Sequence, residues 1–357
     1  MVRSAWQIVN SVSPALPDSQ GLLPSPMNSQ QQLHDRILSA ITRGAEDREI
    51  DELFLELYRH HFEANPPYRR FCERLGHGAE SVKSWEEIPA LVTDAFKFPA
   101  HLPSAFQGEA ESIFRTSGTT NEIRGTHRMK SADLYRASVL NGWRHCGPER
   151  VRKTFFLSRP PEELPQSSLV AMFGHLAEDW DCPKSAWIAS QAGFDFSVVE
   201  GATEPVALLG TALAFLELFE QLGDEGLPLP AGSWAMETGG YKGRKIALTK
   251  EALYERFERS LGLKEEQIWN EYSMTELSSQ FFTRGLCQPH RAPPWLRFRL
   301  ARLNPLDEFG YLVIYDLANF WSAPAIQTQD LAVPDGAGFQ LIGRDPAALP
   351  RGCSRAL

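Results

Sequence analysis

The spacing of hydrophobic residues changes along the chain and divides it into regions. Between Leu33 and Leu75, apolar residues recur at three- and four-residue intervals, which predicts helices interrupted at Pro66-Pro67. From Ser112 to about Glu271, short apolar runs typical of strands alternate with longer helical patterns. After Pro294 the runs are rich in β-branched and aromatic residues, which predicts further strands. The chain therefore combines a helical part, a layered α/β part and a β-rich end.

Individual elements follow from these patterns. Strands are predicted in the middle region at Ser112–Arg115, Thr154–Ser158, Ser185–Ala189, Trp234–Met236 and Gln267–Asn270. Helices are predicted between them at Ser131–His145, Ser168–Trp180, Pro205–Leu222 and Lys250–Leu261. Further strands are predicted at Trp295–Leu303, Tyr311–Tyr315 and Phe339–Ile342. Because strands and helices alternate, we expect an α/β fold with a largely parallel sheet.

We expect this pattern to correspond to four parts of the molecule. They are a flexible leader at 1–30, a helical N-terminal part of the core at 31–110, an α/β core at 111–290 and a small β-rich C-terminal subdomain at 291–357. The leader has neither the basic segment nor the apolar segment of a signal peptide. Met27 stands just before the first helical pattern, so a start there is an alternative.

Composition narrows the classes of function. The 357 residues carry a net charge of −9 without a dense basic run, so we expect no binding to nucleic acid. The longest apolar stretch, Val206–Leu216, has about half the length of a membrane span, so no transmembrane segment is expected. Five widely spaced cysteines without a Cys-x-x-Cys motif indicate neither a disulfide framework nor a zinc site. We expect a cytoplasmic protein with reduced thiols.

Hydroxyl side chains gather around a glycine in the segment Thr116–Asn121. The segment follows a predicted strand, and its hydroxyl and backbone N–H groups would form a surface suited to phosphate oxygens. It differs from the ordinary P-loop because no Gly-Lys-Ser/Thr follows, and the next cation is Arg124. Taken alone, such a cluster is also typical of a plain turn.

Downstream segments strengthen the hypothesis of a nucleotide site. Gly239 and Gly240 follow a predicted strand, and a glycine backbone lets a flat ligand approach closely. Within Asn270–Glu276, an aromatic ring, a hydroxyl and a carboxylate suit a base, a phosphate oxygen and Mg²⁺ respectively. Asp330 suits ribose hydroxyls. The alternatives are a strand end with a core tyrosine and a surface glutamate, and a turn-forming aspartate.

These motifs resemble the adenylate-forming enzymes, which use ATP to convert a carboxylate into an acyl-adenylate. Thr116–Thr120, Tyr272-x-x-Thr275-Glu276, Asp330 and Gly343-Arg344 occur in the order of that family. Within it, the chain is most similar to the acyl-protein synthetases of bacterial bioluminescence, the ligases of the fatty-acid reductase complex. That likeness spans about residues 85 to 357 and rests on Met236–Arg244, Asn270–Phe281, Pro293–Arg297, Tyr315–Asn319 and Arg351–Ser354.

The resemblance implies a role for each matching residue. It assigns Thr116, Ser117, Gly118, Thr119 and Thr120 to the phosphate loop, and Gly239 and Gly240 to the glycine loop at the nucleotide. It assigns Tyr272 to adenine, Thr275 to the α-phosphate, Glu276 to Mg²⁺, Asp330 to ribose and Arg344 to the end of the nucleotide site. The implied fold is the layered N-terminal domain of these enzymes.

The chain departs from the family in two places. Asn121 stands where glycine usually ends the phosphate loop, and asparagine tolerates left-handed backbone, so the departure is mild. No lysine follows Lys264, so we expect no full C-terminal lysine domain, and another cation must balance the phosphate charge. Lys242 is our first candidate, although a solvated surface lysine is the more common case for such a residue.

Cys353 matches the cysteine that receives the acyl group in the resembling family. Arg351 and Arg355 flank it and favour its thiolate form. The implied function is ATP-dependent activation of a carboxylic acid, expected to be a fatty acid, transfer to Cys353 as a thioester and delivery to a partner such as an acyl reductase. The alternatives are an acyl- or aryl-CoA ligase and a catalytically idle nucleotide-binding protein.

Overall fold

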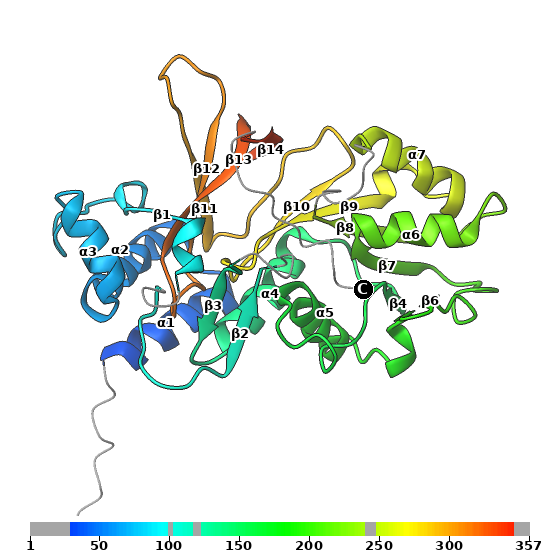
Figure 1. The fold of residues 1–357 in the computed structure, drawn as a ribbon, viewed down its shortest axis with the longest axis horizontal. Coiled ribbons are helices and arrows are strands. Elements are labelled where there is room, and N and C mark those ends of the chain that lie inside the picture. Colours follow the sequence, from blue (N-terminus) through cyan, green and yellow to red (C-terminus); the bar gives the residue numbers. More distant parts are fainter. Residues whose placement is uncertain (1–28, 99–102, 117–122, 240–247, 346–357) are drawn as a thin grey trace, which may run out of the picture.

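The computed structural model describes residues 29–98, 103–116, 123–239 and 248–345 (Figure 1). The chain begins its described part with three helices, α1 (Ser29–Arg43), α2 (Asp47–Ala64) and α3 (Pro66–Arg74). Asn65 separates the last two, and its side chain accepts a hydrogen bond from the backbone N–H of Tyr68. The predicted interruption at Pro66-Pro67 is thus the start of a new helix, because proline is favoured in the first turn of a helix.

A five-stranded sheet forms the middle of the molecule, with strand order β10-β9-β8-β7-β4. Its strands are β4 (Lys153–Phe156), β7 (Val206–Thr211), β8 (Trp234–Thr238), β9 (Ile268–Tyr272) and β10 (Phe281–Arg284). The first four are parallel to one another, and β10 is antiparallel to β9. Helices α6 (Ala212–Leu222) and α7 (Lys250–Leu261) lie on one side of this sheet, with α4 (Asp133–Cys146) and α5 (Ser168–Asp179) on the other (Figure 1).

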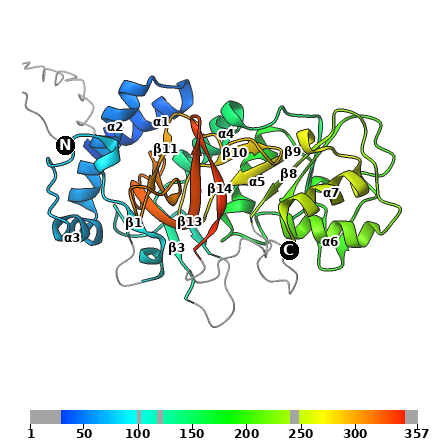
Figure 2. The same ribbon diagram turned by 90° about the horizontal axis from the view of Figure 1, so that it is seen from above.

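A second five-stranded sheet lies between the N-terminal helices and the middle sheet (Figure 2). It contains β1 (Leu91–Val92), β11 (Leu296–Ala301), β12 (Gly310–Asp316), β13 (Ala325–Asp335) and β14 (Gly338–Arg344). Smaller pairs are β2 (Ser112–Arg115) with β3 (Thr126–Met129) and β5 (Ala189–Ser190) with β6 (Gly193–Phe194). The 3₁₀ turns are η1 (Trp85–Glu87), η2 (Thr93–Lys97), η4 (Lys184–Ala186) and η5 (Glu265–Gln267). The α/β fold class predicted from the sequence is confirmed, whereas the four domain boundaries stay predictions.

One predicted helix is wrong in its first half. Residues 205–222 were expected to form one helix, but Val206–Thr211 is strand β7 and only Ala212–Leu222 is helical. All six residues of β7 are buried between two neighbouring strands, and a fully buried strand is uniformly apolar and resembles a buried helix in sequence. Thr211 marks the change, because its hydroxyl accepts a hydrogen bond from Ala214 N at 3.0 Å and caps α6.

Another predicted element is also shifted. The strand expected at Ser185–Ala189 is a 3₁₀ turn, η4, followed by the short strand β5. The remaining predicted strands and helices of the middle region agree with the structure to within a few residues at their ends.

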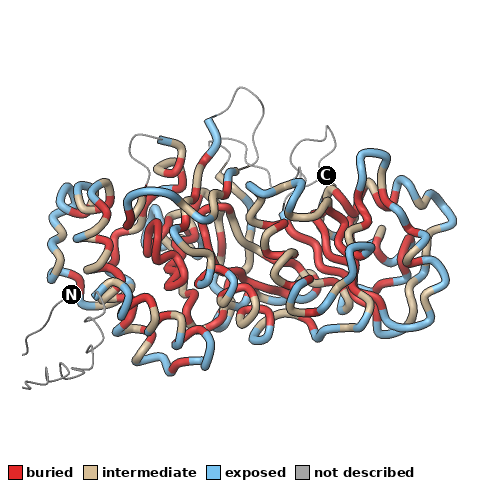
Figure 3. The backbone as a smooth tube through the Cα atoms, turned by 90° about the horizontal axis from the view of Figure 1, so that it is seen from below, coloured by how far each residue is buried: buried red, intermediate tan, exposed pale blue. Residues whose placement is uncertain are grey.

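Buried residues concentrate on the two sheets and on the inner faces of the helices (Figure 3). Aromatic rings fill the space between α6, α7 and the sheet, with the Phe215 and Phe257 ring centroids 4.6 Å apart. Within the described ranges, no helix is both long enough and apolar enough to span a bilayer. The cytoplasmic location stays a prediction.

We expect Phe257→Ala to lower the free energy of unfolding by about 3 to 5 kcal/mol, because it leaves a cavity among well-packed rings. Phe257 is fully buried and its ring centroid also lies 5.1 Å from that of Phe219. Urea denaturation followed by tryptophan fluorescence measures the change. Leu303→Ala is the control, because Leu303 is 79% exposed and its truncation leaves no cavity. Equal stability of the two variants would contradict the packing described for α6 and α7.

Candidate active site

The candidate site lies where the β2–β3 hairpin meets the loop that follows β9. Strands β7, β8 and β9 run parallel, so their carboxyl ends meet at one edge of the sheet, and ligands of α/β sheets bind at such an edge. Tyr272 ends β9, and residues 275–280 of the following loop are all buried. The buried loop carries Thr275 and Glu276, so the alternative of a surface glutamate at Glu276 is wrong.

Thr116 and Glu276, which are far apart in sequence, meet across Gly125. Thr116 N donates to Gly125 O at 2.9 Å, and Gly125 N donates to Thr116 Oγ1 at 2.8 Å. A β-carbon on Gly125 would lie 3.0 Å from Thr116 Cγ2 and 3.3 Å from Glu276 Oε1, so a larger residue would displace one of them. The glycine therefore lets the carboxylate approach the base of the predicted phosphate loop.

His127 on β3 connects the hairpin to the loop that follows β9. Its Nδ1 lies 2.9 Å from Thr275 O, and because a carbonyl only accepts, Nδ1 carries the proton. Burial lowers the pKa of His127 to about 4, so the ring is neutral near pH 7. Its Nε2 is buried and has no hydrogen-bond partner among the residues that the structure describes. His127 therefore holds the Thr275 carbonyl without adding positive charge to the site.

Tyr272 and Asp330 come together although they belong to different sheets. The Tyr272 hydroxyl donates to Asp330 Oδ2 at 2.8 Å. Asp330 lies within strand β13, opposite Arg344 of β14, so it is not a turn former. Arg344 Nη2 donates to Gln329 Oε1 at 2.7 Å. Tyr272 and Asp330, predicted to bind the base and the ribose, thus lie with Arg344 in one group at the junction of the two sheets.

A second cluster of buried polar groups joins β8 and β9. Glu237 Oε1 accepts from Asn270 Nδ2 at 2.9 Å and lies 3.5 Å from Lys250 Nζ, while Asn270 Oδ1 lies 2.9 Å from His290 Nε2. Burial raises the pKa of Glu237 and lowers that of His290 to about 3. These bonds hold β8 and β9 together directly before Gly239, where the backbone takes a positive φ of 80°.

Glu271 is a further buried acid at the end of β9, on the other face of the sheet. Thr238 Oγ1 donates to Glu271 Oε2, and burial raises the pKa of Glu271 to about 7. Motif reasoning missed Glu271, His127 and Lys250, because each matters through neighbours that are distant in sequence. Their sequence signal was weak: His127 and Glu271 are ionisable residues within short strands, and Lys250 is the first residue of a helix.

The structure tests the placement of only part of the predicted site. Thr116, Gly239, Tyr272, Thr275, Glu276, Asp330 and Arg344 are described, whereas Ser117, Gly118, Thr119, Thr120, Gly240, Lys242 and Cys353 lie outside the described residues. Six of the seven described residues form two groups, Thr116 with Thr275 and Glu276, and Tyr272 with Asp330 and Arg344, while Gly239 directly follows β8. Their roles toward a ligand stay predictions.

The donor set around Glu276 suits a hard cation. Carboxylate and hydroxyl oxygens are the ligands that Mg²⁺ prefers, and Mg²⁺ commonly uses one or two carboxylates together with substrate phosphates. In the described ranges, no three His, Cys, Asp or Glu side chains gather in a way that could hold a metal ion by themselves. Glu276 beside Thr116 therefore fits a magnesium ion shared with a nucleotide better than a metal held by protein alone.

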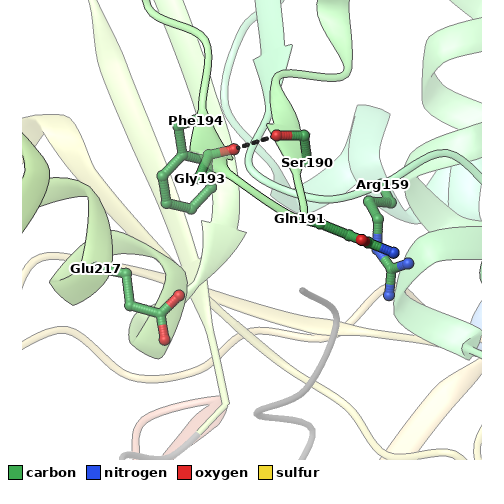
Figure 4. Close-up of a pocket in the computed structure, with 6 residues that line it drawn as sticks. All are labelled: Arg159, Ser190, Gln191, Gly193, Phe194 and Glu217. Atoms are coloured by element: carbon green, nitrogen blue, oxygen red, sulfur yellow. Dashed lines mark hydrogen bonds between the residues drawn. The ribbon is translucent and has the colours of Figure 1, made fainter.

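A pocket of about 360 Å³ lies beyond the carboxyl end of β4 (Figure 4). Arg159 and Glu217 approach it from opposite sides, and Phe194 forms part of the wall between them. The rest of the lining is Ser190, Gln191 and Gly193. A long alkyl chain prefers an apolar lining, so this charged pocket does not suit the chain of a fatty acid.

Comparison with known proteins gives relatives in sequence and in fold. No protein-family model matches the chain. Two similar curated proteins are both named long-chain-fatty-acid–luciferin-component ligase. The one from Vibrio harveyi is 41% identical over 63 residues, which cover 18% of this chain and 16% of the relative. The one from Aliivibrio fischeri is 20% identical over 341 residues, which cover 87% of this chain and 89% of the relative.

Solved structures share the fold. An open conformation of 2-hydroxyisobutyryl-CoA ligase in complex with 2-HIB-AMP and CoA matches with a TM-score of 0.59 at 16% identity, over 85% of this chain and 71% of that chain. The same ligase in the postadenylation state matches with a TM-score of 0.56 over 86% of this chain and 70% of that chain. The predicted resemblance to the adenylate-forming enzymes and the predicted fold class are confirmed.

We expect the stability of the protein to fall more steeply on acidification in the wild type than in His127→Gln. The folded pKa of His127 is about 4 and the unfolded value is 6.5, so between these values only the unfolded state takes up the proton. One such proton contributes a slope of at most about 1.4 kcal/mol per pH unit. Glutamine keeps a donor for Thr275 O but does not titrate. Urea denaturation at several pH values measures the difference, and parallel pH profiles would contradict a buried neutral His127.

Proposed function

We propose that this chain, which has the fold of the adenylate-forming ligases, activates a carboxylic acid with ATP as an acyl-adenylate. The observation that carries the proposal is the meeting of Thr116, at the base of the phosphate loop, with the buried carboxylate of Glu276 across Gly125. The pairing of Tyr272 with Asp330 supports a nucleotide, because an aromatic ring and a carboxylate suit a base and its ribose.

The adenylation step requires two anions to react. A carboxylate oxygen of the acid attacks the α-phosphorus of ATP, the bond to the β-phosphate oxygen breaks, and pyrophosphate leaves. Hydroxyl and backbone N–H groups of the 116–120 loop would bind the phosphates, Thr275 would orient the α-phosphate and Tyr272 with Asp330 would hold the nucleoside. Bound Mg²⁺, held by Glu276, would supply charge neutralisation at the phosphates. Lys242 is the proposed additional cation.

We assign the second step to Cys353. Its thiolate attacks the acyl carbonyl, a carbon–sulfur bond forms, and AMP leaves with the electron pair of the broken carbon–oxygen bond. Three of the other cysteines are poorly suited, because burial raises the pKa of Cys72 and Cys146 to about 11 and also raises that of Cys182. The names of the Vibrio harveyi and Aliivibrio fischeri relatives favour a fatty acid as substrate. A partner such as an acyl reductase would then consume the thioester.

A second candidate function is transfer of the acyl group to coenzyme A. The structural relative with the TM-score of 0.59 is a CoA ligase solved with CoA. The two candidates share the adenylation step and differ in the thiol that receives the acyl group.

We expect Glu276→Ala to lower ATP–pyrophosphate exchange in the presence of fatty acids by about 10²-fold, because it removes a contact used in the transition state. Exchange of radiolabelled pyrophosphate into ATP measures the step, with acids of different chain length tested in turn. Glu308→Ala is the matched control, since Glu308 is an exposed glutamate away from the site. Wild-type exchange in Glu276→Ala would remove the site assignment, and no exchange in the wild type with any acid would favour an idle nucleotide-binding protein.

We expect Cys353→Ala to keep pyrophosphate exchange and to lose ATP-dependent covalent labelling by a radioactive fatty acid, since alanine has no thiol. In the wild type, neutral hydroxylamine should release the label, because it cleaves thioesters. Cys287→Ala is the control, because Cys287 is the exposed cysteine among the described residues. Labelling of Cys353→Ala at the wild-type level would make CoA the better acceptor.

A further inference from the structure

The loop from Ser273 to Gln280 carries the proposed nucleotide contacts but has no regular secondary structure. Residues 275–280 are nevertheless buried, so their backbone groups must find hydrogen-bond partners in other parts of the chain. Several of these partners come from one turn, Asp316–Asn319, which begins at the last residue of β12. We call it the clamp turn.

Asp316 binds the loop through both carboxylate oxygens. Oδ2 accepts from Ser278 N and Ser279 N, each at 2.9 Å, and Oδ1 accepts from Ser279 Oγ at 2.7 Å. Oδ1 also accepts from Ala318 N at 3.0 Å, which closes the clamp turn on itself. The carboxylate is 1% exposed and is fully surrounded by donors.

Asn319 binds the residue that carries the proposed metal ligand. Its Nδ2 donates to Glu276 O at 2.9 Å, and its Oδ1 accepts from Ser278 Oγ at 2.7 Å. The amide therefore bridges the backbone of Glu276 and the side chain two residues later. Asp316 and Asn319 together bind the loop at Glu276, Ser278 and Ser279.

The other side of the loop is held by separate elements. His127 of β3 donates to Thr275 O, as described above. Trp295 Nε1 donates to Ser138 Oγ at 2.9 Å, and Ser138 Oγ lies 2.6 Å from Ser279 Oγ. Because Ser279 Oγ donates to Asp316, Ser138 must be the donor to Ser279. The successive hydrogen bonds from Trp295 to Asp316 therefore all donate in the same direction.

Stability alone is a weak reason for this arrangement. A carboxylate that is buried loses its hydration, and apolar residues of similar volume often replace buried charges without loss of stability. Hydrogen bonds to Glu276, Ser278 and Ser279 do fix the position of the loop that carries these residues. Groups that orient a metal ligand affect metal affinity even though they do not touch the metal.

We propose that Asp316 and Asn319 are positioning residues that hold the Thr275–Ser279 loop so that Glu276 presents its carboxylate to a magnesium–nucleotide complex. The inference rests on the proposed function and deepens it. Neither residue touches the nucleotide. They act through the Glu276 carbonyl and the two serines that follow it, so we expect their loss to weaken the binding of Mg²⁺ before it weakens the binding of free nucleotide.

Two variants of unchanged size test the proposal. Asn319→Asp keeps the acceptor for Ser278 but replaces the donor to Glu276 O with a carboxylate oxygen, which repels that carbonyl. Asp316→Asn replaces an acceptor of two backbone N–H groups with an amide. Ser278→Ala removes only the hydroxyl bond to Asn319 and serves if the first two variants do not fold. Thr283→Val is the matched control, because Thr283 lies on β10 and its hydroxyl donates to Gln288 O and to neither the loop nor the clamp turn.

The first readout is the rise in melting temperature caused by ATP, measured with and without Mg²⁺ in the full chain, because a ligand that binds the folded state raises it. We expect the clamp variants to lose most of the Mg²⁺-dependent part of the rise and to keep the part caused by ATP alone. The second readout is the Mg²⁺ concentration for half-maximal pyrophosphate exchange, expected to rise by about 10- to 100-fold in the clamp variants. Thr283→Val should lower the melting temperature of the free protein without either change.

The outcomes separate the inference from the proposed function. Clamp variants that lose stability to the same extent as Thr283→Val, with wild-type dependence on Mg²⁺, would show that the clamp turn is only structural and would overturn the inference. A wild type without pyrophosphate exchange and without a rise in melting temperature on addition of ATP would instead overturn the proposed function, and the inference with it.

Discussion

A buried loop without secondary structure must have its backbone hydrogen bonds completed by other parts of the chain, and this constraint governs the candidate site. The 275–280 loop obtains its partners from β3, from α4 and from the turn after β12. Strand β12 belongs to the second sheet and α4 packs against the first, so the loop is defined only when both sheets are in place. The site is therefore a product of the junction between the sheets.

The same burial shifts the pKa values of the ionisable groups around the site. Desolvation favours the neutral form of each ionisable group, so the pKa of His127 falls to about 4 and that of Glu271 rises to about 7. Asp316 has a pKa raised to about 6 by burial, although four hydrogen bonds to its carboxylate oppose the shift. Burial therefore disfavours negative charge at Glu271 and Asp316, and the Asp316 carboxylate is surrounded by donors.

Much of the fold was predictable from the sequence because hydrophobic periodicity reports local structure. The alternation between Ser112 and Glu271 predicted the parallel sheet, and α7 and α5 begin and end close to the predicted residues. The prediction was wrong for β7, because a strand buried on both faces lacks the polar alternation that distinguishes it from a helix. Thr211, the capping residue, was the available signal for the boundary.

The sequence by itself determined the class of fold, the family resemblance and the residues with suitable chemistry, such as Tyr272, Glu276 and Asp330. These depend on residue type and local spacing, which a sequence shows directly. Only the tertiary structure decided that Glu276 is buried against Gly125 and that Tyr272 donates to Asp330. It also decided that Asp316 holds the loop that carries Glu276. These contacts join residues separated by 37 to 151 positions, and no periodicity carries information across such distances, because it is the packing of the two sheets that brings them together.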